Sequence, residues 1–249
     1  MNIYLLRGLV REKEHWNWFK SYIEAQFPNA NIVLLEIPGV GETCDQVSPD
    51  SFKEMVKFMR DKHEQSIVNG QENILMAMSL GGMIARVWLD TYPQDFKKVI
   101  LVNTSFKGIT PLFKRLRPLS LLRFINIFFT PSIESREKKI LAMVSNNKVE
   151  REKLIDAWVE IQKKRPVRRK SFINQIKAAL TSKVSIEMPK GVELLIIGAK
   201  GDGLCHYESS ILLNKAWGGE LKIHESAGHD LPIDDPNWLV TTIKNWYQK

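Results

Sequence analysis

Short apolar runs alternate with amphipathic helical stretches along most of the chain. The runs are rich in Ile, Val and Leu and have the length of buried strands, at residues 3–6, 31–37, 73–78, 99–102, 193–197 and 220–224. Helical patterns lie between them at residues 15–26, 49–65, 81–91, 208–217 and 237–247. Parallel strands joined by helices need right-handed crossovers, which place helices on both faces of the sheet. The sequence therefore predicts an α/β fold with about six mostly parallel strands.

Two Pro-containing dipeptides predict where helices begin. Ser48 precedes Pro49, and Asp235 precedes Pro236. Ser and Asp are favoured at the N-cap, and Pro is favoured at the first helical position because its missing N–H is not needed there. We therefore expect Ser48 and Asp235 to cap the helices that follow them.

One segment breaks the alternation of strands and helices. Four prolines divide residues 106–186 into three or four predicted helices, at residues 112–129 in two pieces, 135–145, 150–164 and 168–182. The segment lies between the predicted strands at 99–102 and 193–197. We therefore expect a core of residues 1–105 and 187–249 and an α-helical cap of residues 106–186, inserted before the strand at 193–197.

The net charge of +8 is distributed unevenly along the 249 residues. Residues 107–183 hold 19 Lys and Arg against 6 Asp and Glu, a net charge of +13, whereas the remainder holds 17 against 22, a net charge of −5. An ordinary hydrophobic content of 44% excludes a disordered or collagen-like chain. With two cysteines there is no disulfide framework, and residues 1–10 lack the features of a signal peptide, so we expect a cytoplasmic protein.

The segment ILMAMSLGG, residues 74–82, runs from an apolar strand through a serine into a helix. Ala77 and Gly81 flank Ser79 two positions away on either side. A nucleophile on a sharp strand-to-helix turn has a strained backbone, and small neighbours allow the two arms of the turn to approach. The same pattern also occurs at ordinary helix starts, but the strand–turn–helix context favours a nucleophilic Ser79.

A serine nucleophile needs a base, and the base needs a carboxylate that orients it. His229 lies in a loop of small residues after the last predicted strand, and Asp202 lies among glycines after the strand at 193–197. Turn aspartates and surface histidines are common, but the order Ser79, Asp202, His229 is that of an α/β-hydrolase triad. Of the other histidines, His15 and His63 lie in predicted helices and are expected to be solvated.

The oxyanion of a tetrahedral intermediate needs donors as well. The Leu80 N–H follows the nucleophile, and the Leu9 N–H lies in the turn after the first strand, so these two amides are the candidates for an oxyanion hole. No His, Cys or Asp spacing is typical of a zinc or iron site. Cys205 does not lie on a strand-to-helix turn like that of Ser79. We therefore expect neither a metal nor an organic cofactor.

Taken together, these segments resemble those of compact esterases of the α/β-hydrolase superfamily with an α-helical cap. LLRGL corresponds to the oxyanion turn, EIPGVGET to the following Pro-Gly-x-Gly loop, AMSLGG to the nucleophile turn, GAKGDGLC to the acid loop and AGHDLPIDDP to the histidine loop. Within that group the chain is most similar to the carboxylesterases of biotin synthesis that demethylate pimeloyl-acyl carrier protein methyl ester. Two departures are Arg7 in place of the usual His and the absence of the first two strands of the full fold.

The cap combines apolar and basic residues. Ten apolar side chains crowd its start: Leu112, Phe113, Leu116, Leu119, Leu121, Leu122, Phe124, Ile127, Phe128 and Phe129. Most are expected to be buried in a helical hairpin on the core, and the functional alternative is an acyl pocket beneath a basic rim. Arg115, Arg117 and Arg123 of this rim are candidates for binding the substrate or a carrier protein. A second basic cluster at residues 163–170 adds Arg165, Arg168 and Arg169 as candidates, and the alternative for this cluster is a solvated loop between helices.

Three kinds of anionic partner would complement the basic charge: an acyl carrier protein, an anionic membrane surface, or nucleic acid. Nucleic acid ranks last because no binding module accompanies the charge. A membrane would be contacted at its surface only, because the most apolar segment is too short to span a bilayer. The predicted activity is hydrolysis of a small-molecule or acyl-chain carboxylic ester through an acyl-enzyme. The alternatives are a short-chain esterase, lipase or lactonase at anionic membranes, and a ligand receptor without catalysis.

Overall fold

The computed structural model describes residues 1–182 and 184–249, which contain one six-stranded parallel sheet. The strand order is β2-β1-β3-β4-β5-β6, and all five neighbouring pairs are parallel. The strands are β1 Asn2–Leu6, β2 Asn31–Leu35, β3 Asn73–Met78, β4 Lys98–Val102, β5 Glu193–Ala199 and β6 Glu220–His224. The predicted fold class of about six parallel strands is confirmed.

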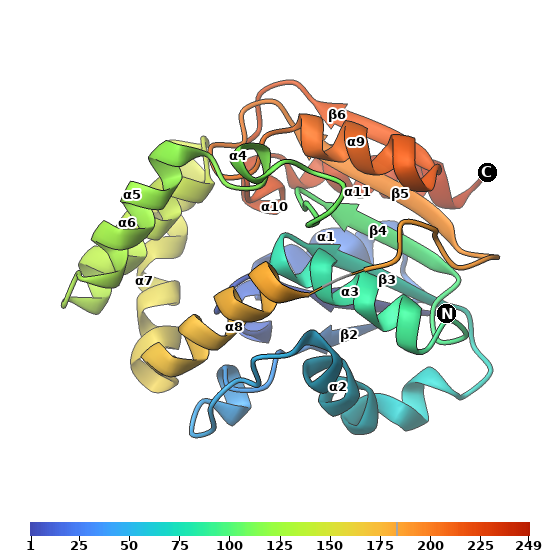
Figure 1. The fold of residues 1–249 in the computed structure, drawn as a ribbon, viewed down its shortest axis with the longest axis horizontal. Coiled ribbons are helices and arrows are strands. Elements are labelled where there is room, and N and C mark those ends of the chain that lie inside the picture. Colours follow the sequence, from blue (N-terminus) through green and yellow to red (C-terminus); the bar gives the residue numbers. More distant parts are fainter. Residues whose placement is uncertain (183) are drawn as a thin grey trace.

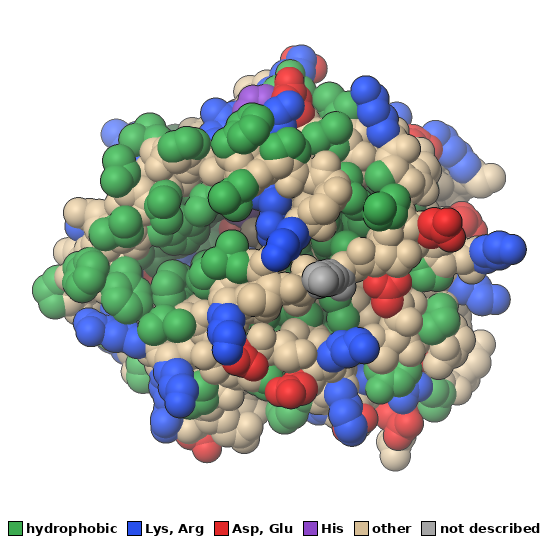
Figure 2. All heavy atoms as spheres, in the orientation of Figure 1, with side chains coloured by type: hydrophobic (Ala, Val, Ile, Leu, Met, Phe, Trp, Pro, Cys, Tyr) green, Lys and Arg blue, Asp and Glu red, His purple; other side chains and the backbone are tan. Residues whose placement is uncertain are grey.

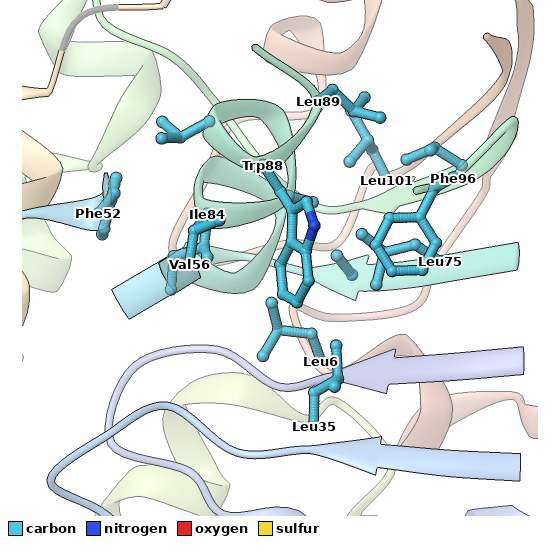
Figure 3. Close-up of a cluster of buried hydrophobic side chains, with 14 of the residues drawn as sticks. Leu6, Leu35, Phe52, Val56, Leu75, Ile84, Trp88, Leu89, Phe96 and Leu101 are labelled. Atoms are coloured by element: carbon cyan, nitrogen blue, oxygen red, sulfur yellow. The ribbon is translucent and has the colours of Figure 1, made fainter. Parts of the chain in front are cut away.

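Helices cover both faces of this sheet (Figure 1). The 3-10 helix η1 (Lys13–Trp16), α1 (Asn17–Gln26) and α11 (Pro236–Tyr247) pack on one face, and α2 (Phe52–Ile67), α3 (Leu80–Thr91) and α9 (Glu208–Trp217) pack on the other. Successive strand residues point to opposite faces, so Leu5 joins the first layer and Leu6 the second. Figure 3 shows Trp88 and Ile84 of α3 lying over Leu6 and Leu75 of the sheet. This two-sided burial explains why the four central strands, β1, β3, β4 and β5, are apolar after their first residue.

The two predicted N-caps have different outcomes. The Asp235 carboxylate accepts a hydrogen bond from the Trp238 N–H at 3.0 Å, with Pro236 at the first helical position of α11, as predicted. The prediction for Ser48 is wrong, because α2 begins at Phe52 after Ser51. The Ser48 hydroxyl instead donates to the Pro38 carbonyl at 2.7 Å and is buried.

The segment between β4 and β5 contains five helices within the described residues: α4 Leu112–Arg115, α5 Pro118–Phe128, α6 Ile133–Val144, α7 Lys148–Lys164 and α8 Arg169–Thr181. We call residues 106–186 the insert. Figure 1 shows α5, α6 and α7 grouped beside the sheet, with α8 running back toward α3. Its division from the core as a separate cap domain stays a prediction.

The expectation that the apolar start of the insert would be mostly buried is wrong. Of the ten apolar residues named above, Ile127 is buried, whereas Leu112, Phe113, Leu119, Leu121, Leu122 and Phe129 are exposed. Helix α5 is apolar around most of its circumference, and the side that faces the rest of the protein carries Ser120, Phe124, Ile127 and Phe128. The other side of the helix faces outward.

Two further structural findings concern membranes and metals. No helix among the described residues combines the length and the apolar character needed to cross a membrane. Within residues 1–182 and 184–249, no three His, Cys, Asp or Glu side chains gather as a metal ion would need.

Candidate active site

Ser79 occupies the sharp turn between β3 and α3. Its backbone has φ 55° and ψ −121°, a conformation that L-residues rarely adopt. The turn depends on small neighbours: a Cβ on Gly81 would lie 2.5 Å from the Arg7 carbonyl oxygen, and a Cβ on Gly8 would lie 3.0 Å from the Ser79 Cβ. The Ser79 N–H donates to the Val102 carbonyl at 2.9 Å, and the Ser79 carbonyl accepts from the Thr104 hydroxyl at 2.7 Å. The turn is therefore fixed by the adjoining end of β4.

The three residues expected to form a triad meet, although they lie far apart in the sequence. The Ser79 Oγ is 2.9 Å from the His229 Nε2, and the His229 Nδ1 is 2.7 Å from the Asp202 Oδ2. A carboxylate can only accept, so Nδ1 carries the proton and Nε2 is left to accept from the serine hydroxyl. His229 and Asp202 are buried, whereas Ser79 is half-buried. The arrangement is that of a nucleophile, a general base and an orienting acid.

The carboxylate of Asp202 is fixed by its own loop. Its Oδ1 accepts from the Leu204 N–H at 2.7 Å and from the Cys205 N–H at 2.9 Å, which leaves Oδ2 for His229. Cys205 itself is buried, and burial, helped by the Asp202 charge, raises the pKa of its thiol to about 12. The thiol therefore stays protonated and does not compete with Ser79 as a nucleophile.

Asp202 holds the imidazole of His229, and Asn103 holds its backbone. The Asn103 side-chain amide, at the end of β4, donates to the His229 carbonyl at 2.8 Å and to the Gly228 carbonyl at 3.2 Å. Burial lowers the pKa of His229, but the charge and hydrogen bond of Asp202, together with the Asp230 charge, outweigh it, so that the pKa lies above its ordinary value. Asn103 was not among the predicted site residues, because a lone Asn after a strand carries no signal of its partner in the sequence.

The candidate oxyanion donors lie on either side of Ser79. Leu80 is the first residue of α3, and Leu9 follows Gly8, which lies against the serine. Among the hydrogen bonds of the described residues, none uses the N–H of Leu9 or Leu80. Val10 has a positive φ of 50°, which is strained for a β-branched residue, and its N–H donates to the side chain of buried Gln175 in α8 at 2.9 Å. A residue of the insert therefore fixes the turn that carries Leu9.

Arg7, which stands where the resemblance leads one to expect His, forms a buried ion pair beside His229. Its guanidinium donates to both carboxylate oxygens of Asp230, at 3.2 and 2.5 Å, and lies over the Trp16 ring, 4.7 Å from its centroid. Asp230 directly follows His229, so the pair connects the loop after β1 to the histidine loop. A pair separated by 223 residues leaves no local signal in the sequence.

The insert is bonded to the loops that present Asp202 and His229. The Asn146 side-chain amide, between α6 and α7, donates to the Gly201 carbonyl at 3.1 Å and to the Ser226 carbonyl at 3.0 Å. The Ser120 hydroxyl of α5 donates to the Gly203 carbonyl at 2.5 Å. These contacts connect the insert to both the acid loop and the histidine loop. Neither Asn146 nor Ser120 was among the predicted site residues.

The structure does not gather the six candidate arginines into one surface. Arg165 is paired with Glu12, at 3.1 Å, and with Glu14, so its charge is used within the chain. Glu12 is buried, and this burial raises its pKa to about 7 although Arg165 acts in the opposite direction.

The other five arginines are spread over three places. Arg115 is half-buried and donates to the Ala179 carbonyl at 2.9 Å, and Arg117 is also half-buried. Arg123 is exposed near Gly203 of the acid loop. Arg168 and Arg169 are exposed at the start of α8, where the Arg169 guanidinium lies 5.4 Å from the centroid of the Phe128 ring.

One prediction about the remaining histidines is wrong. His15 is completely buried, on the 3-10 helix η1, with its ring edge-on to Trp158 of α7 at a centroid distance of 4.8 Å. Burial and the neighbouring Arg11 charge keep its pKa well below the ordinary value. The insert covers a surface that the core alone would expose, which is why His15 is not solvated.

A protein-family model matches residues 28–236, which are most of the chain. The matching family model is described as serine aminopeptidase, S33. The chain belongs to the serine aminopeptidase S33 family. This S33 member is therefore a hydrolase with the α/β-hydrolase fold. No curated protein matches the S33 chain in sequence.

Solved structures similar to this S33 hydrolase share its fold at low sequence identity. An esterase from Exiguobacterium antarcticum has 14% identity and a TM-score of 0.81, over 100% of this chain and 92% of that one. The 2-hydroxy-6-oxo-6-phenylhexa-2,4-dienoate hydrolase of Rhodococcus sp. strain RHA1 has 17% identity and a TM-score of 0.76, over 100% and 90%. An enol-lactonase from Burkholderia xenovorans LB400 has 13% identity and a TM-score of 0.74, over 100% and 91%.

Proposed function

We propose that the protein hydrolyses carboxylic esters through a covalent acyl-enzyme, with Ser79, His229 and Asp202 as its catalytic residues. The observation that carries this proposal is the continuous hydrogen-bonded chain from the Ser79 Oγ to the His229 Nε2, at 2.9 Å, and from the His229 Nδ1 to Asp202, at 2.7 Å. The similarity to an esterase and an enol-lactonase supports it.

In the first step the Ser79 Oγ attacks the ester carbonyl while His229 Nε2 removes the hydroxyl proton. Asp202 holds the imidazole in the productive tautomer and stabilises the imidazolium that forms. The N–H groups of Leu9 and Leu80 stabilise the negative charge on the carbonyl oxygen. The tetrahedral intermediate then collapses, and His229 returns the proton to the departing alcohol.

The second half of the reaction repeats these roles with water. His229 Nε2 takes a proton from water, which attacks the acyl carbonyl, and the Ser79 Oγ leaves with that proton. The carboxylic acid is released, and Ser79 and His229 regain their starting protonation states.

For the substrate, the resemblance to the carboxylesterases of biotin synthesis supports a methyl ester of an acyl chain on an acyl carrier protein. In the second basic cluster, Arg168 and Arg169 are exposed, whereas Arg165 is engaged with Glu12 and Glu14. Charge reversal at Arg168 and Arg169 should therefore raise KM for a carrier-linked ester and leave short p-nitrophenyl esters unaffected. Equal effects on both substrates would contradict the carrier-linked assignment.

The test of the proposed reaction is a substrate panel with wild-type protein and the Ser79→Ala variant. It compares short p-nitrophenyl esters, a lactone, a carrier-linked methyl ester and an aminoacyl p-nitroanilide, together with labelling by a fluorophosphonate. We expect ester turnover and labelling by the wild type and loss of both in Ser79→Ala. Preference for the anilide would assign the chain to peptide chemistry, and no turnover of any substrate would favour a ligand receptor.

A further inference from the structure

The outer side of α4 and α5 exposes a group of large apolar side chains. They are between 49% and 71% exposed, and we call them the outer apolar surface: Leu112, Phe113, Leu119, Leu121, Leu122, Ile125 and Phe129. Among all described residues, twelve large hydrophobic side chains are exposed, and seven of them lie in this stretch of 18 residues. Exposed apolar side chains scattered singly are ordinary, but a contiguous group marks an interaction site.

Basic residues accompany this surface, and acidic residues are absent from its sequence. No Asp or Glu occurs between Asp95 and Glu134, whereas residues 107–123 contain five Lys and Arg. Arg123 is exposed among the apolar residues of α5. Figure 2 shows hydrophobic side chains gathered on the side where Figure 1 places α5, with basic side chains beside them.

A second group of cations borders the same surface. The rings of Phe128 in α5 and Phe172 in α8 are in contact, tilted at 35° with a centroid distance of 5.5 Å, which brings the start of α8 against the end of α5. Arg168, Arg169 and Lys170 are exposed there. The outer apolar surface is thus flanked by Arg123 on its own helix and by three cations of the neighbouring helix.

An open groove continues the surface between α5 and α6. Its volume is about 680 Å³, and Leu122, Ile125 and Phe129 form its apolar wall. The opposite wall is polar and includes Lys139, whose ammonium donates to Asn126 and Thr130 rather than to a carboxylate. An apolar wall facing a cation suits an acyl chain with an anionic head.

We propose that the outer apolar surface docks onto an anionic lipid surface, with α5 lying in the plane of the interface. Helices of this kind bind through buried apolar area and through attraction of flanking Lys and Arg to anionic lipid. A second copy of the chain is disfavoured as the occupant because each insert carries a net charge of about +13 and the two would repel. An acidic carrier protein would account for the cations, but it would not require so large an apolar group at their centre.

Vesicle co-flotation tests the docking. Full-length protein is mixed with vesicles of phosphatidylcholine alone or of phosphatidylcholine with phosphatidylglycerol, at low and at physiological salt. We expect binding to the anionic vesicles, weaker binding at the higher salt, and much weaker binding to the neutral ones. The Ser79→Ala variant should bind as the wild type does, so that failure of the docking is distinguished from failure of the proposed function.

Matched variants locate the docking on the molecule. Leu119→Ser, Leu122→Ser and Ile125→Ser together should weaken vesicle binding at least about tenfold. The control combines Val68→Ser, Val149→Ser and Ile186→Ser, at positions that are 59%, 63% and 66% exposed elsewhere, and it should bind normally. Thermal melting followed by circular dichroism confirms that each variant is folded. Replacement of Arg123 and Arg168 by Gln should reduce binding about 25-fold, since each juxtamembrane cation contributes about fivefold.

Three results would overturn the proposal. The first is no binding of wild-type protein to the anionic vesicles. The second is equal loss of binding in the α5 variant and in the control. The third is a wild type that binds purified acyl carrier protein and not vesicles, with that binding lost in the α5 variant, which would assign the surface to an acidic protein.

Discussion

The inner and outer sides of the insert are built from different interactions. On the inner side, Ser120, Asn146 and Gln175 donate or accept directed hydrogen bonds to loops of the core. On the outer side, large apolar residues such as Leu122 and Phe129 are 64% and 71% exposed and lie among cations. Directed bonds fix one geometry, whereas apolar contact and diffuse charge tolerate many. The inner side is therefore suited to positioning catalytic groups, and the outer side to a soft and variable partner.

The largest effect should follow from a change to the loops that the inner side supports. Asp202→Asn keeps the shape of the acid but favours the wrong His229 tautomer, so we expect kcat to fall about 10⁴-fold. Stopped-flow or steady-state hydrolysis of a p-nitrophenyl ester measures this. A near-normal kcat would mean that Asp202 does not orient His229 in the reaction. The hydrogen bonds from the insert to the acid loop would then have no role in catalysis.

The next effect concerns the buried ion pair beside the histidine loop. Asp230→Ala leaves the Arg7 charge buried without a partner, and the free energy of unfolding should fall by about 3–5 kcal/mol. The matched control is Asp50→Ala, which breaks the exposed pair of Asp50 with Lys177 and should lower the free energy of unfolding far less, because solvent screens an exposed pair. Urea unfolding measures both. Equal costs would show that the Arg7 pair is no more important than a surface contact.

Two leucines of the insert compare its sides directly. Leu141 in α6 is fully buried, whereas Leu122 in α5 is 64% exposed. Leu141→Ala should destabilise the protein by about 2–5 kcal/mol because it leaves a cavity. Leu122→Ala should change stability by no more than about 0.5 kcal/mol. A large cost at Leu122 would mean that the outer side packs within the chain and is not open to a partner.

A smaller effect is expected where the insert meets the oxyanion turn. Gln175→Leu removes the acceptor for the strained Val10 N–H, so the Leu9 amide is less well placed and kcat should fall about tenfold at nearly constant KM. Asn174→Ala is the control, because Asn174 bonds the Ser48 carbonyl from the same helix and is not bonded to Val10. If both variants lose kcat equally, Gln175 acts by holding α8 and not by positioning the turn.

The smallest effect is a shift in the midpoint of the pH profile of kcat/KM. His229 must be neutral to accept the serine proton, and its pKa is raised above the ordinary value of 6.5. We therefore expect kcat/KM to fall as the pH drops through a midpoint above 6.5, and to be constant at higher pH. Asp230→Asn removes one of the charges that raise this pKa and should move the midpoint to lower pH. A midpoint that moves upward would contradict the role of Asp230.

Much of the core could be predicted from the sequence, because its signals are local. The strands at 73–78 and 220–224 have the predicted bounds. Ser79, Asp202 and His229 meet because each follows the carboxyl end of a strand of the same parallel sheet. The failures concern contacts between distant segments. His15 is buried because α7 covers it, and Ser48 does not cap α2 because its hydroxyl bonds the Pro38 carbonyl.

The insert was harder to predict for the same reason. Its helices follow from proline and charge patterns, but which side of α5 faces inward depends on Gly203 and on α6, which lie elsewhere in the sequence. A helix that is apolar around most of its circumference gives no preferred inward side. The side chains that support the site, Asn103, Asn146 and Gln175, are ordinary polar residues whose roles depend on distant carbonyls and amides.

The two hydrogen bonds of Asn146 have a consequence for protein engineering. Exchange of inserts between α/β-hydrolases is attractive as a route to new substrates, since the insert is joined to the sheet only through β4 and β5. In this chain, however, a graft that matches only those ends would leave the Gly201 and Ser226 carbonyls without their donor. A successful chimera must therefore include the turn between α6 and α7, placed so that its side-chain amide reaches both carbonyls.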